Sequence, residues 1–236
     1  MYIQEAIILA GGLGTRLKDV VSDIPKVMAP VNGRPFLEYV LDFLEDNIIE
    51  HVVLSVGYKH EIIQNHFKKR YKSISIDYAI EKEPLGTGGG IKKAFELING
   101  SKALVFNGDT MFRVNLNKIF EFHFSKSAQF TVVLRQVDDV SRYGAVATDD
   151  NQRIVRFNEK GQREGIGKIN GGIYLINRNF LTKNNFPEKF SLEKDCFEAL
   201  VDTQAFYGVL CKQYFIDIGI PEDYQKAQDD FKEFEY

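Results

Sequence analysis

Apolar positions in the first half of the chain alternate between two spacings. Short continuous apolar runs, typical of strands buried on both faces, are followed by apolar residues three or four positions apart, typical of amphipathic helices. The pattern predicts strands at residues 6–9, 51–56, 74–78 and 103–106, and helices at residues 36–44, 61–67 and 91–98. This strand–helix–strand rhythm predicts a mostly parallel sheet with helices on both faces.

The second half of the chain has a different pattern, in which strands outnumber helices. Strands are predicted at residues 130–134, 144–147, 154–157, 173–176, 205–209 and 215–218, with one helix near residues 192–201 and a final helix at residues 221–234. We therefore expect all 236 residues to form a single α/β domain, a three-layer α/β/α, Rossmann-like fold around a mixed, mostly parallel central sheet. Two lobes, about residues 1–125 and 126–236, are expected to form the walls of a cleft.

Charge and cysteine content narrow the class of protein. The net charge is −3, which argues against a nucleic-acid binder that works by neutralising many phosphates. Cys196 and Cys211 have neither the spacing of metal ligands nor the number needed for a disulfide framework, as expected in a reducing cytoplasm. The chain shows no secretory pattern and no apolar run of transmembrane length. We therefore expect a cytoplasmic protein that binds neither nucleic acid nor membrane.

A glycine-rich loop directly follows the first predicted strand and carries the strongest functional signal. The residues at this junction are Leu9, Ala10, Gly11, Gly12 and Gly14. Glycines at the end of a buried strand let the backbone approach a ligand closely, because a Cβ there would collide with it. Arg16 and Lys26 follow, and such cations pair with phosphate groups. The loop is therefore interpreted as a nucleoside triphosphate site.

Two other kinds of phosphate-binding loop do not match this segment. A dinucleotide-binding G-x-G-x-x-G fingerprint would need a third glycine where this chain has Leu17, and a P-loop would need a G-K-[S/T] run that the chain lacks. The loop instead resembles the signature of the sugar-1-phosphate nucleotidyltransferases, with Thr15, Arg16, Pro25 and Lys26 in matching places. The resemblance extends over roughly residues 4–225.

A second glycine-rich segment, residues 83–89, looks like the part of this family that lies against the base and sugar of the nucleotide. Together with the first loop, the resemblance implies nucleotide binding by Glu81, Pro84, Gly86 and Thr87. It also implies that Arg16 binds the β- and γ-phosphates and the leaving pyrophosphate, and that Lys26 binds near the α-phosphate.

Two aspartates occupy positions where the family binds magnesium. Asp109 follows a predicted strand in the run Asn107-Gly108-Asp109, and Asp217 lies within a predicted apolar strand. From the residues alone, Asp109 could equally cap a backbone turn. An unpaired carboxylate in an apolar strand is costly, so Asp217 is expected to have a cationic partner. Mg²⁺ suits such a pair because it typically takes one or two carboxylates plus phosphate oxygens.

The sugar-phosphate side of the site rests on resemblance. Glu159 and Lys160 resemble the family's pair at the sugar phosphate, with Lys160 holding the phosphate and Glu159 accepting from sugar hydroxyls. Gly144, Asn170 and Gly171 lie in segments similar to those that bind the sugar, although Asn170 could also merely hold the turn before Gly171. In the implied reaction the sugar 1-phosphate attacks the α-phosphorus of a nucleoside triphosphate. No covalent enzyme intermediate is expected.

Glu81 bears on the choice of base. A carboxylate offers only acceptors, which suits the adjacent N–H donors of guanine and favours GTP, unless Glu81 is simply solvated. The runs at residues 82–89, 142–144 and 217–224 look most like the D-glycero-D-manno-heptose 1-phosphate guanylyltransferases, which supply GDP-heptose for bacterial surface glycans. The alternatives are mannose 1-phosphate or another base (UTP, CTP or dTTP), and a nucleotide-sugar sensor without turnover. A homo-oligomer is left open.

Overall fold

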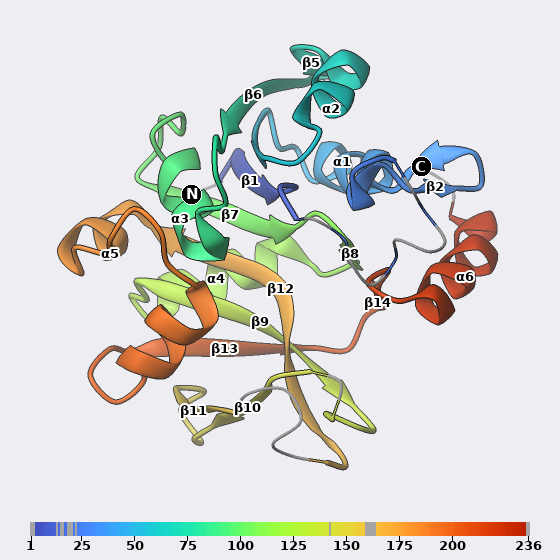
Figure 1. Cartoon of the computed structure of the whole chain (residues 1–236). Helices are drawn as coiled ribbons and strands as arrows, with labels where there is room; N and C mark the ends of the chain where they lie inside the picture. Colours follow the sequence, from blue (N-terminus) through green and yellow to red (C-terminus); the bar gives the residue numbers. More distant parts are fainter. Residues whose placement is uncertain are drawn as a thin grey trace.

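A ten-stranded mixed sheet runs through the molecule in this computed structural model, which describes residues 3–12, 14, 17, 21, 23–141, 143–158 and 164–234 (Figure 1). In pairing order its strands are β11 (Ile154–Asn158), β10 (Ala145–Thr148), β12 (Gly167–Asn177), β7 (Lys102–Asn107), β1 (Glu5–Leu9), β4 (His51–Val56), β6 (Ile74–Ile80) and β5 (Arg70–Tyr71). β9 (Phe130–Val137) also pairs with β12, and β13 (Phe206–Cys211) pairs with β9. Two small sheets join β14 (Phe215–Asp217) to β8 (Thr110–Phe112) and β2 (Pro30–Val31) to β3 (Arg34–Pro35).

The centre of the large sheet is parallel. β1 lies between β4 and β7, so that Ala6 is opposite Val52 on one side and Leu104 on the other, and β6 continues the parallel order beyond β4. β12 then runs antiparallel to β7 and links the parallel strands to β9, β10 and β11. The predicted α/β fold with a mixed sheet is confirmed, while the division into lobes near residue 125 stays a prediction.

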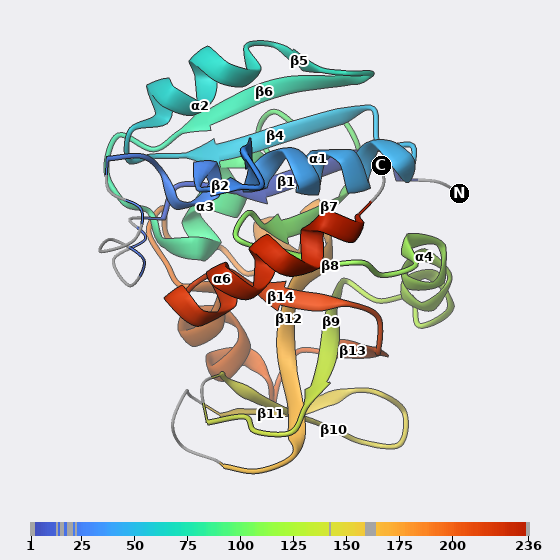
Figure 2. The ribbon, with the colours of Figure 1, turned by 90° about the vertical axis from the view of Figure 1, so that its right-hand side faces the viewer.

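Helices cover both faces of the sheet and make three layers. One core contains Ala6 and Ile8 of β1, and it is closed by α1 (Phe36–Asp46), α2 (His60–Phe67), α4 (Leu116–Ser125) and α6 (Pro221–Asp230). The other core contains Ile7, and it is closed by α3 (Gly86–Ala94), α5 (Arg178–Lys183) and the π-helix η3 (Leu192–Glu198). Figure 2 shows α1 and α6 crossing the first of these faces. Neighbouring residues of β1 therefore point into different cores, which explains its continuous apolar run.

Most predicted elements are present, with differences at their ends. The last predicted helix divides into α6 and the 3₁₀ turns η4 (Phe231–Glu233), and η2 (Lys26–Met28) is a further 3₁₀ helix. Two helices, α4 and α5, were missed by the prediction. The signal for α4 was present, since Leu116, Ile119 and Phe120 are buried at helical spacing and the Asn115 side chain accepts a hydrogen bond from the Lys118 amide at 3.1 Å. No helix in the described part of the chain is long and apolar enough to cross a membrane.

The start of α3 corrects the prediction of a helix beginning at residue 91. α3 begins at Gly86, so Gly88, Gly89 and Gly90 lie inside the helix rather than before it. The reason is close packing: a Cβ on Gly88 would lie 2.2 Å from the Phe190 ring, and one on Gly89 would lie 2.4 Å from the Glu188 carbonyl oxygen. The glycines disfavour a helix locally but let the 188–190 segment pack directly against its backbone.

His123 is a buried polar side chain that ties α4 to the sheet. Its Nδ1 lies 2.8 Å from the Thr131 hydroxyl on β9, and its Nε2 lies 3.1 Å from Oδ1 of Asn177 at the end of β12. Asn177 Nδ2 donates to the Ala128 carbonyl, so Nε2 carries the proton and Nδ1 accepts from Thr131. Burial lowers the pKa of His123 to about 4, which keeps the ring neutral at pH 7.

This lowered pKa predicts a loss of stability on mild acidification. In the unfolded chain His123 binds a proton near pH 6.5, whereas in the folded protein it does so near pH 4. The contribution of His123 to the free energy of unfolding is therefore greatest above pH 6.5. It falls by about 2 kcal/mol between pH 7 and pH 5, because the unfolded chain takes up a proton that the folded protein does not. Urea unfolding at the two pH values measures this loss, and His123→Gln should flatten the slope. If the free energy of unfolding depends equally on pH in both proteins, groups other than His123 cause the dependence.

Candidate active site

The carboxyl ends of the parallel strands meet at one edge of the sheet. The glycine loop after β1 is joined to β4 by a hydrogen bond from the Ala10 amide to the Ser55 carbonyl at 2.8 Å. On the other side of the loop, the Gly108 amide donates to the Leu9 carbonyl at 2.9 Å. Three segments distant in sequence, the glycine loop, the β4–α2 connection and the 107–109 turn, therefore lie together where open α/β sheets bind ligands.

A cleft of about 960 Å³ opens at this edge, within the usual size range for a small-molecule site. Ten of the residues predicted from sequence line it: Leu9, Gly11, Gly12, Gly14, Lys26, Glu81, Pro84, Gly86, Thr87 and Asp109. Ala10 is buried beside them. Thr15 and Arg16 lie outside the described residues. Both glycine-rich segments thus contribute to one cavity, and the roles of individual residues in it stay predictions.

The three glycines of the first loop have different surroundings. A Cβ on Gly11 would lie 3.2 Å from both Glu81 Oε1 and the Gly57 amide, so this position packs against the second segment. Gly14 has a φ of +59°, and its Cβ would lie 2.9 Å from the Cβ of Lys26. Gly12 has no atom within 4 Å of a Cβ and lines the open cleft. Gly11 and Gly14 therefore allow close packing within the protein, whereas Gly12 leaves its space to the cleft.

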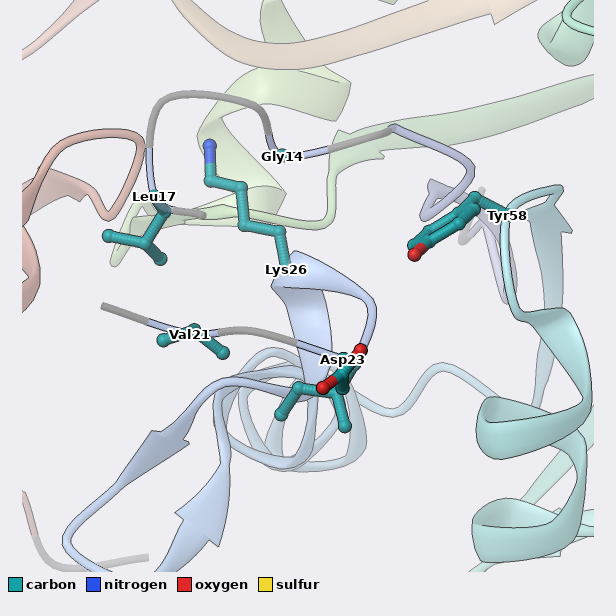
Figure 3. A pocket seen from close by; sticks show the side chains of 7 residues that line it. Gly14, Leu17, Val21, Asp23, Lys26 and Tyr58 are labelled. Carbon is teal, nitrogen blue, oxygen red and sulfur yellow. The ribbon is translucent and has the colours of Figure 1, made fainter. Parts of the chain in front are cut away.

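Lys26 and the two predicted metal-binding aspartates come together beside the cleft. The ladder between β14 and β8 sets Asp217 opposite Thr110, and the Ile218 amide donates to the Asp109 carbonyl at 3.0 Å. The Lys26 ammonium lies 2.6 Å from Asp109 Oδ2 and 3.7 Å from Asp217 Oδ1. Figure 3 shows the Lys26 side chain rising from η2 beside Gly14, with Tyr58 across the cavity.

The chemistry of this pair fits a divalent cation. Two carboxylates already face one positive charge, and each is about one-third exposed, so incoming oxygen ligands could reach them. Among the residues that the structure describes, no group of three or more acidic, histidine or cysteine side chains forms a metal cage. A site with two carboxylates and the remaining ligands from phosphate and water is the arrangement Mg²⁺ favours over an all-protein cage.

The Glu81 carboxylate lies between the two glycine-rich segments and accepts two hydrogen bonds. Its Oε1 accepts a hydrogen bond from the Ser55 hydroxyl at 2.9 Å, and its Oε2 accepts from the Leu85 amide at 3.0 Å. The carboxylate is half-buried beside Gly11 and Gly90, so it is not simply a solvated side chain. Each oxygen retains a lone pair that can accept from a further donor, and the predicted contact with a nucleobase stays a prediction.

The sugar side of the site is only partly described. Glu159 and Lys160 lie outside the described residues. Asn170 sits at an irregularity in β12, where its Oδ1 accepts from the Gly172 amide at 3.0 Å and its Nδ2 donates to the Tyr174 hydroxyl at 2.7 Å. The predicted alternative, a turn before Gly171, is wrong because these residues lie within β12; Asn170 instead fixes the irregular backbone of this strand, and its role in sugar binding stays a prediction.

Gly144 and Gly171 are close to other backbone segments. A Cβ on Gly171 would lie 2.7 Å from the Phe112 ring, and one on Gly144 would lie 3.2 Å from the Asn158 carbonyl oxygen. Gly144, Asn170 and Gly171 do not line the cleft formed by the described residues. Asn107 lines the cleft, and a Cβ on Gly172 would lie 2.9 Å from its side-chain amide, so this part of β12 lies next to the cleft. The two glycines have a packing role, and their predicted contact with sugar phosphate is untested.

The sequence prediction missed the β4–α2 connection. Residues 57–61 line the cleft, and Tyr58 is 39% exposed there. Lys59 has a left-handed backbone (φ 50°), and its ammonium donates to the Asp23 carbonyl at 2.8 Å, which ties this connection to the chain leading to Lys26. A signal was available, since the strand predicted at residues 51–56 is parallel to the first strand and must end at the same edge.

Comparison with known proteins shows similarity to nucleotidyltransferases. The family described as Nucleotidyl transferase matches this chain over residues 5–233. A D-glycero-alpha-D-manno-heptose 1-phosphate guanylyltransferase from Aneurinibacillus thermoaerophilus is 48% identical over 98% of this chain and 99% of its own length. The protein of the same name from Campylobacter jejuni is 44% identical over 93% of this chain and 96% of its own length. The crystal structure of HddC from Yersinia pseudotuberculosis complexed with GMP-PN is similar at a TM-score of 0.84 and 40% identity, over 97% of this chain and 100% of that one.

Proposed function

The chain belongs to the nucleotidyl transferase family, and from this we propose that it transfers GMP from GTP to D-glycero-alpha-D-manno-heptose 1-phosphate. The products are GDP-heptose and pyrophosphate, and GDP-heptose supplies the synthesis of bacterial surface glycans. The reaction takes place in the cytoplasm, with Mg²⁺ as the cofactor. Two relatives with this activity in their names support the substrate, and they match over nearly their whole length. The neighbour complexed with GMP-PN supports the base.

The observation that carries the proposal is the meeting of Lys26, Asp109 and Asp217 beside a glycine-lined cleft. The reaction must bring together two anions, a sugar phosphate and a nucleoside triphosphate. A lysine and a carboxylate pair suited to a divalent cation provide the positive charge that such an encounter requires. Glycines in the loop supply backbone amides without side chains in the way.

The reaction needs little proton transfer. The sugar phosphate is already ionised at neutral pH, so its oxygen attacks the α-phosphorus without a strong general base, and pyrophosphate leaves in line. Lys26 binds near the α-phosphate, and Arg16 binds the β- and γ-phosphates and the departing pyrophosphate. Lys160 holds the sugar phosphate, and Glu159 accepts from the sugar hydroxyls. Asp109 and Asp217 would hold Mg²⁺, which would supply positive charge to offset the repulsion between the two phosphates. Rate enhancement then comes from positioning and charge stabilisation.

A substrate panel tests this function. Pyrophosphate release is measured with GTP, UTP, CTP and dTTP, each paired with heptose 1-phosphate, mannose 1-phosphate and glucose 1-phosphate. The highest kcat/KM is expected for GTP with the heptose. A higher value with mannose 1-phosphate, or with another base, would replace the substrate assignment. Binding of GDP-heptose without release for any pair would favour the sensor.

The identity of residue 81 is expected to influence the choice of base. Glu81→Gln replaces one acceptor oxygen by a donor, so the preference for GTP over UTP should fall about tenfold in kcat/KM. Ser55→Ala is the matched control, because it removes one hydrogen bond to Glu81 and leaves the carboxylate in place. The control should keep the wild-type preference. If Glu81→Gln keeps the wild-type preference for GTP over UTP, Glu81 has only the structural role given by its hydrogen bonds to Ser55 and Leu85.

A further inference from the structure

The Lys26 ammonium lies where a metal ion would contact the aspartate pair. Its Nζ is 2.6 Å from Asp109 Oδ2 and 3.7 Å from Asp217 Oδ1, and the side chain is only 12% exposed. Gly219 leaves room for this placement, since a Cβ there would lie 3.0 Å from Lys26 Nζ and 2.9 Å from Asp217 Oδ1. The same ammonium is the group expected to bind the α-phosphate, so the carboxylates and the phosphate compete for one positive charge.

We propose that Lys26 is the resident cation of the Asp109–Asp217 pair in the substrate-free protein, and that it must leave this position before a divalent ion binds there. The inference rests on the proposed function, because it takes these two aspartates as the metal ligands. It adds a second role for Lys26: the side chain lowers the affinity of the free protein for metal and is released to the phosphate when substrate arrives.

Charge explains why the lysine competes with the metal. Both carboxylates are negative, and the Lys26 ammonium offsets part of this charge while it donates a hydrogen bond to Asp109. A divalent ion alone must displace the ammonium from a hydrogen bond of 2.6 Å, with no phosphate to receive it. A metal ion that arrives with nucleotide brings phosphate oxygens for the displaced lysine. Metal and nucleotide therefore favour each other's binding.

The structure gives the lysine a short path between its two partners. Lys26 is the first residue of η2, and four rotatable carbons separate its backbone from the ammonium. Its stem lies beside Gly14, where an added Cβ would lie only 2.9 Å from the Lys26 Cβ (Figure 3). Gly14 belongs to the loop predicted to hold the triphosphate. Rotation of the stem can therefore carry the ammonium from the carboxylates toward the loop without movement of the backbone.

Binding of Mn²⁺ to the substrate-free protein tests the proposal without an activity readout. Free Mn²⁺ is followed by electron paramagnetic resonance in titrations of wild type, Lys26→Met, Lys26→Gln and Lys26→Arg. The two neutral variants should bind Mn²⁺ at least tenfold more tightly than wild type, a difference of about 1.4 kcal/mol. Lys26→Arg keeps the charge and should bind weakly, as wild type does. Thermal unfolding checks each fold, and either neutral variant alone suffices if the other misfolds.

Equal or weaker Mn²⁺ binding by the neutral variants would overturn the proposal. Adding Asp109→Asn to Lys26→Met should abolish the tight binding, and tight binding that survives this change would place the ion elsewhere and also overturn it. The proposed function is judged separately by pyrophosphate release from the wild-type protein. An active enzyme whose Lys26 variants bind Mn²⁺ no more tightly would reject only the competition by Lys26.

Discussion

Asp109→Ala is expected to lower kcat for nucleotide-sugar formation by about 10³-fold, the scale seen when one charge-stabilising group is removed from an active site. The change removes the carboxylate that lies 2.6 Å from Lys26 and one of the two proposed metal ligands. Asp109 is about one-third exposed, so its truncation leaves no cavity in the apolar core. Pyrophosphate release at saturating GTP and heptose 1-phosphate measures the loss, and Asp217→Ala should show a similar one.

Two further variants make this result specific. Asp109→Asn keeps the shape of the side chain and removes its charge, so it should resemble Asp109→Ala in activity and wild type in thermal stability. Asp229→Ala is the matched control, because it truncates an aspartate that is 67% exposed on α6 and pairs only with the exposed Lys232 among the described contacts. It should keep full activity. Asp109→Ala activity within tenfold of wild type would remove Asp109 from the proposed metal site.

Gly89→Ala is expected to destabilise the protein by about 3 kcal/mol, although alanine is the better helix former. Gly89 lies within α3, and a Cβ there would be 2.4 Å from the Glu188 carbonyl oxygen and 2.9 Å from the Leu85 side chain. The Glu188 carbonyl belongs to the backbone and cannot rotate away as a side chain can. The added methyl group therefore forces α3 and the 188–190 segment apart. For a chain of this length the midpoint of thermal unfolding should fall by roughly 6–12 °C.

Gly12→Ala provides the contrast. It adds the same methyl group where no atom lies within 4 Å, so stability should change by less than about 0.5 kcal/mol. Calorimetry of the two variants under one set of conditions makes the comparison. A Gly89→Ala protein as stable as wild type would mean that helix propensity outweighs packing at this position.

The parallel centre of the fold could be predicted because its signals are local. The apolar run of β1 and the helical spacing of α1 each lie within about a dozen consecutive residues, and both elements form as expected. The glycine loop was recognised for the same reason, since it directly follows β1 and its basic residues are nearby in sequence. Residues 57–61 and α4 were missed although their signals were present.

Other features depend on contacts between distant parts of the chain. The predicted helix began only after Gly88–Gly90, and contacts with Phe190, Glu188 and Ser55 explain why these three glycines lie inside it. The distance between Asp109 and Lys26 depends on the folding of β1, η2 and β7 around one sheet edge, and Asp217 joins them through the ladder between β14 and β8.

The sequence by itself determined the family and the chemical types of the charged residues, and it predicted the nucleotide loop, because residue identity and short spacing carry that information. Tertiary structure alone decided which charges meet. The acceptor oxygens of Glu81 predict contact with a guanine base, and its bond to the Leu85 amide is local, but its bond to Ser55 depends on packing against β4. Likewise, the sequence predicts Lys26 as a phosphate-binding residue and two aspartates as metal ligands. The pairing of the lysine with these carboxylates depends on distances of a few ångströms between segments far apart in sequence. Electrostatic interactions depend on separation in space, which no local pattern of residues records.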